Sequence, residues 1–184
     1  MSHAEKRLFT AIEIPYEWRL AIRRLQDTLR REGVRARFTP EARIHLTINF
    51  IGETREEARI RDVLAGLERP VAPSLSLGSV GLFSRRKGGD LIVWEIDCDP
   101  SFLSYQKQEK KALMSLGLPL DDRRYRPHLT IAREAFGDYL KTESFQKIKG
   151  QRSSFQVEEG VLFQSLFEAG KLQYLPLLRY LFSK

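Results

Sequence analysis

The chain has 184 residues, of which 42% are hydrophobic and 30% are charged, a composition typical of a globular protein with a buried core. Its 31 Lys and Arg residues outnumber 24 Asp and Glu residues, and the net charge of +7 favours a polyanionic partner. The single cysteine, Cys98, excludes an internal disulfide framework and a thiolate metal cluster. The segment Met1–Pro15 has the pattern of neither a secretory signal nor a membrane span. We therefore expect a cytoplasmic, monomeric protein without a membrane partner.

In the first half of the chain, hydrophobic periodicity predicts alternating strands and helices. Residues 7–14 alternate as a strand does, and a helix follows whose buried stripe is Trp18, Ile22, Leu25 and Leu29. Gly33 is placed to close this helix. The remaining patterns predict strands over 35–39 and 44–51, then a helix opened by a capping box of Thr54 and Glu57.

In the second half, two strands over 74–83 and 91–97 are predicted to form a hairpin with a charged turn. Asp99 and Pro100 are typical of a helix start, and that helix is expected to reach Gly117. A strand beginning at His128 and closing strands over 155–167 and 172–182 complete the prediction, with a short helix or loop over 136–150.

This order of elements indicates an α+β protein. We expect residues 1–184 to form a single domain of two intertwined lobes. Each lobe would be an antiparallel-rich sheet backed by helices, with a groove between the lobes.

One tetrapeptide occurs twice. His45-Leu46-Thr47-Ile48 recurs as His128-Leu129-Thr130-Ile131, although the chain holds only three histidines. Because side chains alternate along a strand, each copy presents its His and Thr on one face and its Leu and Ile on the other. A single copy would be an ordinary half-buried strand, but two identical copies indicate a shared function.

Two such faces suit proton transfer at a phosphate. One imidazole can act as a base while the other acts as an acid, and each Thr hydroxyl can donate to an anionic oxygen. A zinc site would need three or four ligands, which the sequence does not gather, so we expect neither a metal nor a cofactor. The chemistry that fits is in-line displacement at phosphorus.

The repeat and its flanks resemble the 2H phosphoesterase superfamily. Within it, the chain is similar to the bacterial and archaeal RNA 2',3'-cyclic phosphodiesterases, also called 2'-5' RNA ligases. The segments that carry the similarity, besides the two tetrapeptides, are Arg7–Pro15, Asn49–Glu53, Arg126-Pro127, Ala132-Arg133 and Val161–Ser165.

The resemblance implies a two-lobed, pseudo-symmetric fold and metal-independent hydrolysis of 2',3'-cyclic phosphate ends of RNA, tRNA fragments among them, to 2'-phosphomonoesters. It also implies a reverse 2'-5' ligation. By this resemblance His45 is the proton donor and His128 the proton acceptor, while Thr47, Thr130 and Arg133 bind the phosphate. Strict alternation would turn Arg133 away from His128, so we expect a bulge or a strand end between them.

Phe9, Phe50, Tyr125 and Arg126 are candidate RNA contacts, through stacking or charge. Basic residues close to both motifs, among them Arg37 and Arg43 before the first and Arg124 before the second, would attract an RNA backbone. Two alternatives stay open: an RNA-end-binding module without turnover, and a 2H phosphodiesterase that acts on small cyclic nucleotides.

Overall fold

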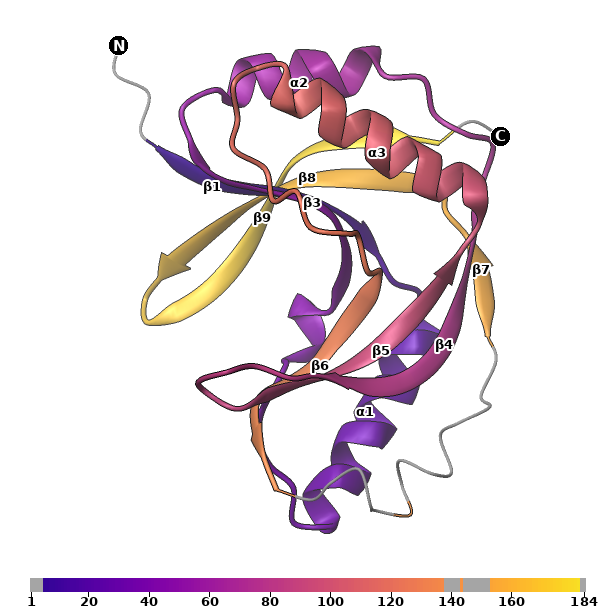
Figure 1. Ribbon diagram of the computed structural model, residues 1–184, viewed down its shortest axis with the longest axis vertical. Coiled ribbons are helices and arrows are strands. Elements are labelled where there is room, and N and C mark those ends of the chain that lie inside the picture. The colour runs from indigo at the N-terminus through magenta and orange to yellow at the C-terminus, as the bar shows by residue number, and fades with distance from the viewer. Residues whose placement is uncertain (1–4, 138–142, 144–152, 183–184) are drawn as a thin grey trace.

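The computed structural model describes residues 5–137, 143 and 153–182, and two antiparallel sheets form its framework (Figure 1). The first sheet has the order β3-β1-β8-β9, and its strands are β1 (Lys6–Glu13), β3 (His45–Thr54), β8 (Glu159–Glu168) and β9 (Lys171–Leu181). The second has the order β2-β6-β5-β4-β7, with β2 (Arg35–Phe38), β4 (Ser74–Phe83), β5 (Asp90–Cys98), β6 (His128–Phe136) and β7 (Ser154–Gln156). The predicted α+β class is confirmed.

Helices α1 (Tyr16–Arg31) and α3 (Pro100–Met114) link the two lobes, each of which is one sheet with the helices that cover it (Figure 1). The third helix is α2 (Glu57–Gly66), and a 3-10 turn η1 (Glu41–Arg43) precedes β3. Helix α1 follows β1 of the first sheet but packs on the second, where Trp18 meets Phe155 edge to face. Helix α3 follows β5 of the second sheet but lies with α2 over the first (Figure 1), where Tyr105 meets Phe182. Each lobe therefore takes elements from both halves of the chain.

The residues predicted to end helix α1 and to begin helix α3 do so in the structure. Helix α1 ends with Glu32 as its cap and Gly33 at a φ of 78°, a backbone conformation that glycine adopts at low cost. Asp99 caps α3 by accepting a hydrogen bond from the Ser101 N–H at 2.8 Å, and Pro100 occupies the first turn.

Two expectations need correction. The strand predicted over 155–167 is divided between the sheets, because β7 pairs with β4 whereas β8 pairs with β1. The capping box is not formed: Thr54 accepts from the Glu56 N–H, and Glu57 forms ion pairs with Lys6 and Arg61. The short helix or loop expected over 136–150 lies mostly outside the described residues.

The core joins both sheets and all three helices. Leu46 and Ile48 of β3 and Leu129 and Ile131 of β6 are at most 2% exposed and belong to the same buried cluster. The apolar faces of both tetrapeptides therefore point inward, as predicted. In the described part of the chain, no helix is long and apolar enough to cross a membrane.

Candidate active site

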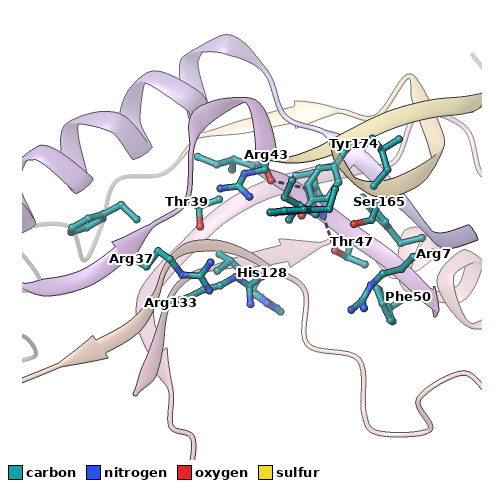
Figure 2. Close-up of a pocket in the computed structure, with 18 residues that line it drawn as sticks. Arg7, Arg37, Thr39, Arg43, Thr47, Phe50, His128, Arg133, Ser165 and Tyr174 are labelled. Carbon is teal, nitrogen blue, oxygen red and sulfur yellow. Dashed lines mark hydrogen bonds between the residues drawn. The ribbon is translucent and has the colours of Figure 1, made fainter. Parts of the chain in front are cut away.

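The two His-x-Thr faces line one pocket. A cavity of about 570 Å³ lies between the sheets and is bordered by His45 and Thr47 of β3 and by His128, Thr130 and Arg133 of β6. Figure 2 shows His128 and Arg133 on one side of it and Thr47 on the other. The five residues that the sequence predicted for catalysis and phosphate binding are thus brought together. This volume suits a nucleotide-sized ligand.

Each tetrapeptide has a bulge at its last residue. In β3, Thr47 pairs with Ala11 and Asn49 with Thr10, which leaves Ile48 as an extra residue. In β6, Thr130 pairs with Val93 and Ala132 with Ile92, which leaves Ile131 as the extra residue. A bulge changes the face on which later side chains emerge.

The bulges explain why Arg133 reaches the site. Ile131 and Ala132 are both fully buried, so the next residue, Arg133, returns to the face of His128 and Thr130. Phe50 returns to the pocket after Ile48 and Asn49 in the same way. The bulge expected before Arg133 is therefore present.

Both imidazoles have the same tautomer when neutral. The Nδ1 atom of His45 lies 2.9 Å from the Arg43 carbonyl, and that of His128 lies 2.7 Å from the Arg126 carbonyl. Because a carbonyl can only accept, each Nδ1 carries a hydrogen, and each Nε2 is free to exchange a proton. In His45, Nε2 lies 3.1 Å from the Thr47 hydroxyl, which donates to the neutral ring.

Aromatic side chains surround His45. Phe9 lies 4.9 Å from it and Tyr174 of β9 lies 5.2 Å away at an interplanar angle of 85°. Burial is the main cause that lowers the pKa of His45 to about 4; the charges of Arg133 and His128 act in the same direction, and the hydrogen bond to the Arg43 carbonyl opposes them. The unliganded site therefore holds a neutral His45 at neutral pH.

The surroundings of His128 are more polar. Its ring meets Phe83 edge to face at 4.8 Å, and Arg126 lies 4.0 Å above the same Phe83 ring while it pairs with Glu95 at 3.1 Å. Burial lowers the pKa of His128, and so do the charges of Arg133 and Arg126, whereas Glu95 opposes the shift. A bound anion would raise the pKa of both imidazoles.

The four candidate RNA contacts have different positions. Phe50 lines the pocket, is 47% exposed and carries the Arg7 guanidinium 5.0 Å above its ring, so it can stack on a base. Phe9 also lines the pocket, but it is 3% exposed and packs on His45 and Tyr174, so it offers no free face.

Tyr125 and Arg126 support the site from its edge. The Tyr125 hydroxyl donates to the Thr47 carbonyl at 2.8 Å, which ties the segment before β6 to the first motif. Tyr125 is partly buried against the main core and is not among the residues that line the pocket, and its contact with RNA stays a prediction. Arg126 is engaged with Glu95 and Phe83 beside His128.

Several pocket residues were not predicted as site residues, although two of them, Arg7 and Ser165, lie in segments that carry the resemblance. They are Arg7, Thr39, Ser165, Leu166, Phe167, Leu172 and Tyr174. Most of them come from the β8–β9 hairpin, whose position over the first motif depends on pairing between distant strands. Arg37 and Arg43, noted only as basic neighbours of the motif, also line the pocket. Within the described residues, no three His, Cys, Asp or Glu side chains are grouped so that they could hold a metal ion.

Comparisons with known proteins find similarity to phosphoesterases. Residues 12–94 match the family model described as LigT-like phosphoesterase. The chain is 29% identical to the RNA 2',3'-cyclic phosphodiesterase of Methanocaldococcus jannaschii over 136 residues, 73% of this chain and 75% of that protein. It is 28% identical to the Escherichia coli enzyme of the same name, covering 95% of this chain and 96% of that protein.

A solved structure has the same fold. The crystal structure of Escherichia coli LigT in its apo form superposes with a TM-score of 0.79 at 21% identity, over 98% of this chain and 99% of that one. The chain thus shares the fold of Escherichia coli LigT, and its residues 12–94 are similar to the LigT-like phosphoesterases.

Proposed function

We propose that this enzyme hydrolyses 2',3'-cyclic phosphate ends of RNA to 2'-phosphomonoesters, without a metal. The observation that carries the proposal is that two His-x-Thr faces and Arg133, from opposite sheets, line one pocket. The RNA 2',3'-cyclic phosphodiesterases to which the chain is similar support the choice of substrate.

His128 acts as the base and His45 as the acid. The Nε2 of His128 takes a proton from the attacking water, whose oxygen forms a new bond to phosphorus. The bond from phosphorus to the 3' oxygen breaks, and Nε2 of a protonated His45 gives that oxygen its proton. If the 5'-hydroxyl of a second RNA end attacks in place of water, His128 takes its proton, the bond from phosphorus to the 3' oxygen breaks as before, and the product is a 2'-5' phosphodiester, which is ligation.

The cationic and hydroxyl groups of the pocket stabilise the phosphate. Thr47 and Thr130 donate hydrogen bonds to its non-bridging oxygens, and the Arg133 guanidinium offsets the charge that develops on them. The negative charge of the phosphate raises the pKa of His45 from about 4. His45 therefore becomes protonated as the substrate binds. Crystal complexes of Escherichia coli LigT with phosphate and with 3'-AMP support a phosphate and nucleotide ligand.

Phe50 provides a surface for the terminal base. Its ring is exposed at the pocket and already carries the Arg7 guanidinium, and stacking on an aromatic side chain tolerates any base. Recognition of the end of the strand therefore combines a phosphate site with a base platform.

Turnover of a short oligonucleotide with a 2',3'-cyclic phosphate end, measured in excess chelator, tests the proposal. Replacing either His45 or His128 by Ala should lower kcat by about two to four orders of magnitude, the scale of general acid-base catalysis. Binding without turnover would support the RNA-end-binding module instead. Turnover of small cyclic nucleotides alone would support the phosphodiesterase alternative, and near-normal rates in both Ala variants would refute the assigned roles.

A further inference from the structure

One end of the pocket carries more positive charge than a single phosphate requires. Arg37 is the cross-strand partner of Arg133, and Arg43 lines the same pocket. Burial lowers the pKa of Arg133, and the charges of Arg37, Arg85 and Arg43 lower it further. Arg37 forms an ion pair with Glu134 at 2.8 Å, whereas Arg43 has no carboxylate partner among the described residues.

The Thr39 hydroxyl adds an unused hydrogen-bonding group at the same end. Thr39 lines the pocket, and its Oγ1 is buried without a hydrogen-bond partner among the described residues. Its backbone is fixed on both sides, because its N–H donates to the Ile131 carbonyl at 2.9 Å and its carbonyl accepts from Gln26 at 2.9 Å. A buried hydroxyl without a partner costs stability, so a ligand that accepts from it would recover that cost.

The pocket has two chemically different ends. Figure 2 shows Arg37, Thr39 and Arg43 on one side of His128 and Arg133, and Arg7 and Phe50 on the other. A ribose that holds its cyclic phosphate at the histidines has two further substituents, the base and the 5' oxygen. If the base lies on Phe50, the basic end of the pocket is left for the 5' substituent.

We propose that Arg43, Arg37 and the Thr39 hydroxyl form a second anion subsite for the phosphodiester on the 5' side of the terminal nucleotide. This inference rests on the proposed function for its substrate. It makes the enzyme selective for oligonucleotide ends over mononucleoside 2',3'-cyclic phosphates, because only an oligonucleotide presents the second phosphate.

The test compares a dinucleotide that ends in a 2',3'-cyclic phosphate with the mononucleoside 2',3'-cyclic phosphate. In the parent enzyme, kcat/KM should favour the dinucleotide by about tenfold or more, the scale of a charge-assisted hydrogen bond. Arg43→Gln should abolish that preference, so that the ratio of kcat/KM for the dinucleotide to kcat/KM for the mononucleotide falls to about one, whatever the effect on the mononucleotide rate itself. Thr39→Val should reduce the preference, and Arg43→Lys should keep most of it. Arg24→Gln, an exposed arginine of α1 outside the pocket, is the matched control and should change neither rate.

A dinucleotide with an uncharged methylphosphonate linkage separates charge from base contacts. It should be hydrolysed no faster than the mononucleotide by the parent enzyme. An undiminished preference for the methylphosphonate dinucleotide, or for the natural dinucleotide in Arg43→Gln, would overturn the subsite.

Failure of the subsite and failure of the proposed function give different results. If the parent hydrolyses both natural substrates equally, the subsite is refuted and the proposed function stands. If it hydrolyses neither, the proposed function is refuted, and calorimetry then decides the subsite. A nucleoside 2',5'-bisphosphate should bind the parent about tenfold tighter than the nucleoside 2'-monophosphate does. In Arg43→Gln the two ligands should bind with the same affinity. If the two ligands also bind the parent with the same affinity, the subsite is refuted.

Discussion

His45 and His128 occupy identical tetrapeptides but different surroundings. Aromatic rings enclose His45 and hold its pKa near 4, whereas His128 lies beside the charged pair of Arg126 and Glu95. Sequence symmetry could not distinguish their roles, because the difference arises from Phe9, Tyr174 and Phe83, which no local pattern links to the motifs. The proposed roles rest on the resemblance, and the surroundings of each ring set the direction of its pKa shift.

This asymmetry predicts the pH profile of catalysis. The productive free enzyme needs a neutral His128 and a protonated His45, and both groups have a pKa lowered from 6.5. The profile of kcat/KM should therefore be bell-shaped with its maximum on the acid side of about pH 6.5. The profile of kcat should lie at higher pH, since the bound phosphate raises both pKa values. Rates measured from about pH 4 to 9 check this, and a flat profile across pH 5 to 9 would contradict it.

At the scale of the elements, a buried polar side chain from a covering helix holds each bulge. Gln26 of α1 donates from Nε2 to the Ile131 carbonyl at 3.0 Å and to the Thr39 carbonyl at 2.9 Å. In the first sheet, Asn49 donates to Glu109 of α3 at 3.0 Å and accepts from Gln106 at 2.8 Å. The helices thus direct Arg133 and Phe50 into the pocket as well as covering the core.

Gln26 is therefore expected to position Arg133. Gln26→Met keeps the side-chain volume but leaves the Ile131 carbonyl without this donor, so the bulge should relax and phosphate binding should weaken by about tenfold. In an Arg133→Ala background the same substitution should have almost no further effect on binding. A double-mutant cycle measures this coupling from the affinity of a nucleoside 2'-monophosphate for the parent, for the two single variants and for the double variant. Equal losses in the two backgrounds would show that Gln26 acts only on overall stability.

Elements were predictable from the sequence where the signal is local, and the site only in part. The periodicity around Trp18 and Leu25 and the Asp99-Pro100 start describe one helix each, and the structure confirms both. The bulge before Arg133 was expected only because of the resemblance. The division of 155–167 into β7 and β8, and the approach of Tyr174 to His45, depend on pairing with strands far away in the chain. Such pairing leaves no pattern in a short window.

At the scale of the whole molecule, Glu109 joins several elements of the first lobe. It is fully buried and interacts with Thr10 of β1, Asn49 of β3 and Tyr180, which is 3.2 Å away on β9. Burial raises the pKa of this carboxyl, and the hydrogen bonds only partly oppose the shift. The folded state therefore favours the protonated acid.

Glu109 should make stability depend on pH. Because its pKa is higher in the folded state than in the unfolded state, its contribution is complete below about pH 4.5. That contribution is lost as the pH rises through the folded-state pKa. Glu109→Gln, whose amide imitates the protonated acid, should therefore show a smaller fall in Tm than the parent between about pH 5 and 8. Thermal unfolding at a series of pH values provides the measurement, with Glu53→Gln, an exposed carboxyl of β3, as the control. Parallel Tm curves for parent and Glu109→Gln would contradict the prediction.

The central claim is that imidazoles from opposite sheets act on one phosphate. Titration of the histidine resonances by NMR, with and without a saturating nucleoside 2'-monophosphate, tests it most directly. We predict that one equivalent of ligand shifts the signals of both His45 and His128 and raises the pKa of both. The affinity of the ligand for Arg133→Ala should be much lower than its affinity for the parent. A ligand that perturbs only one of the two imidazoles, or neither, would contradict the claim.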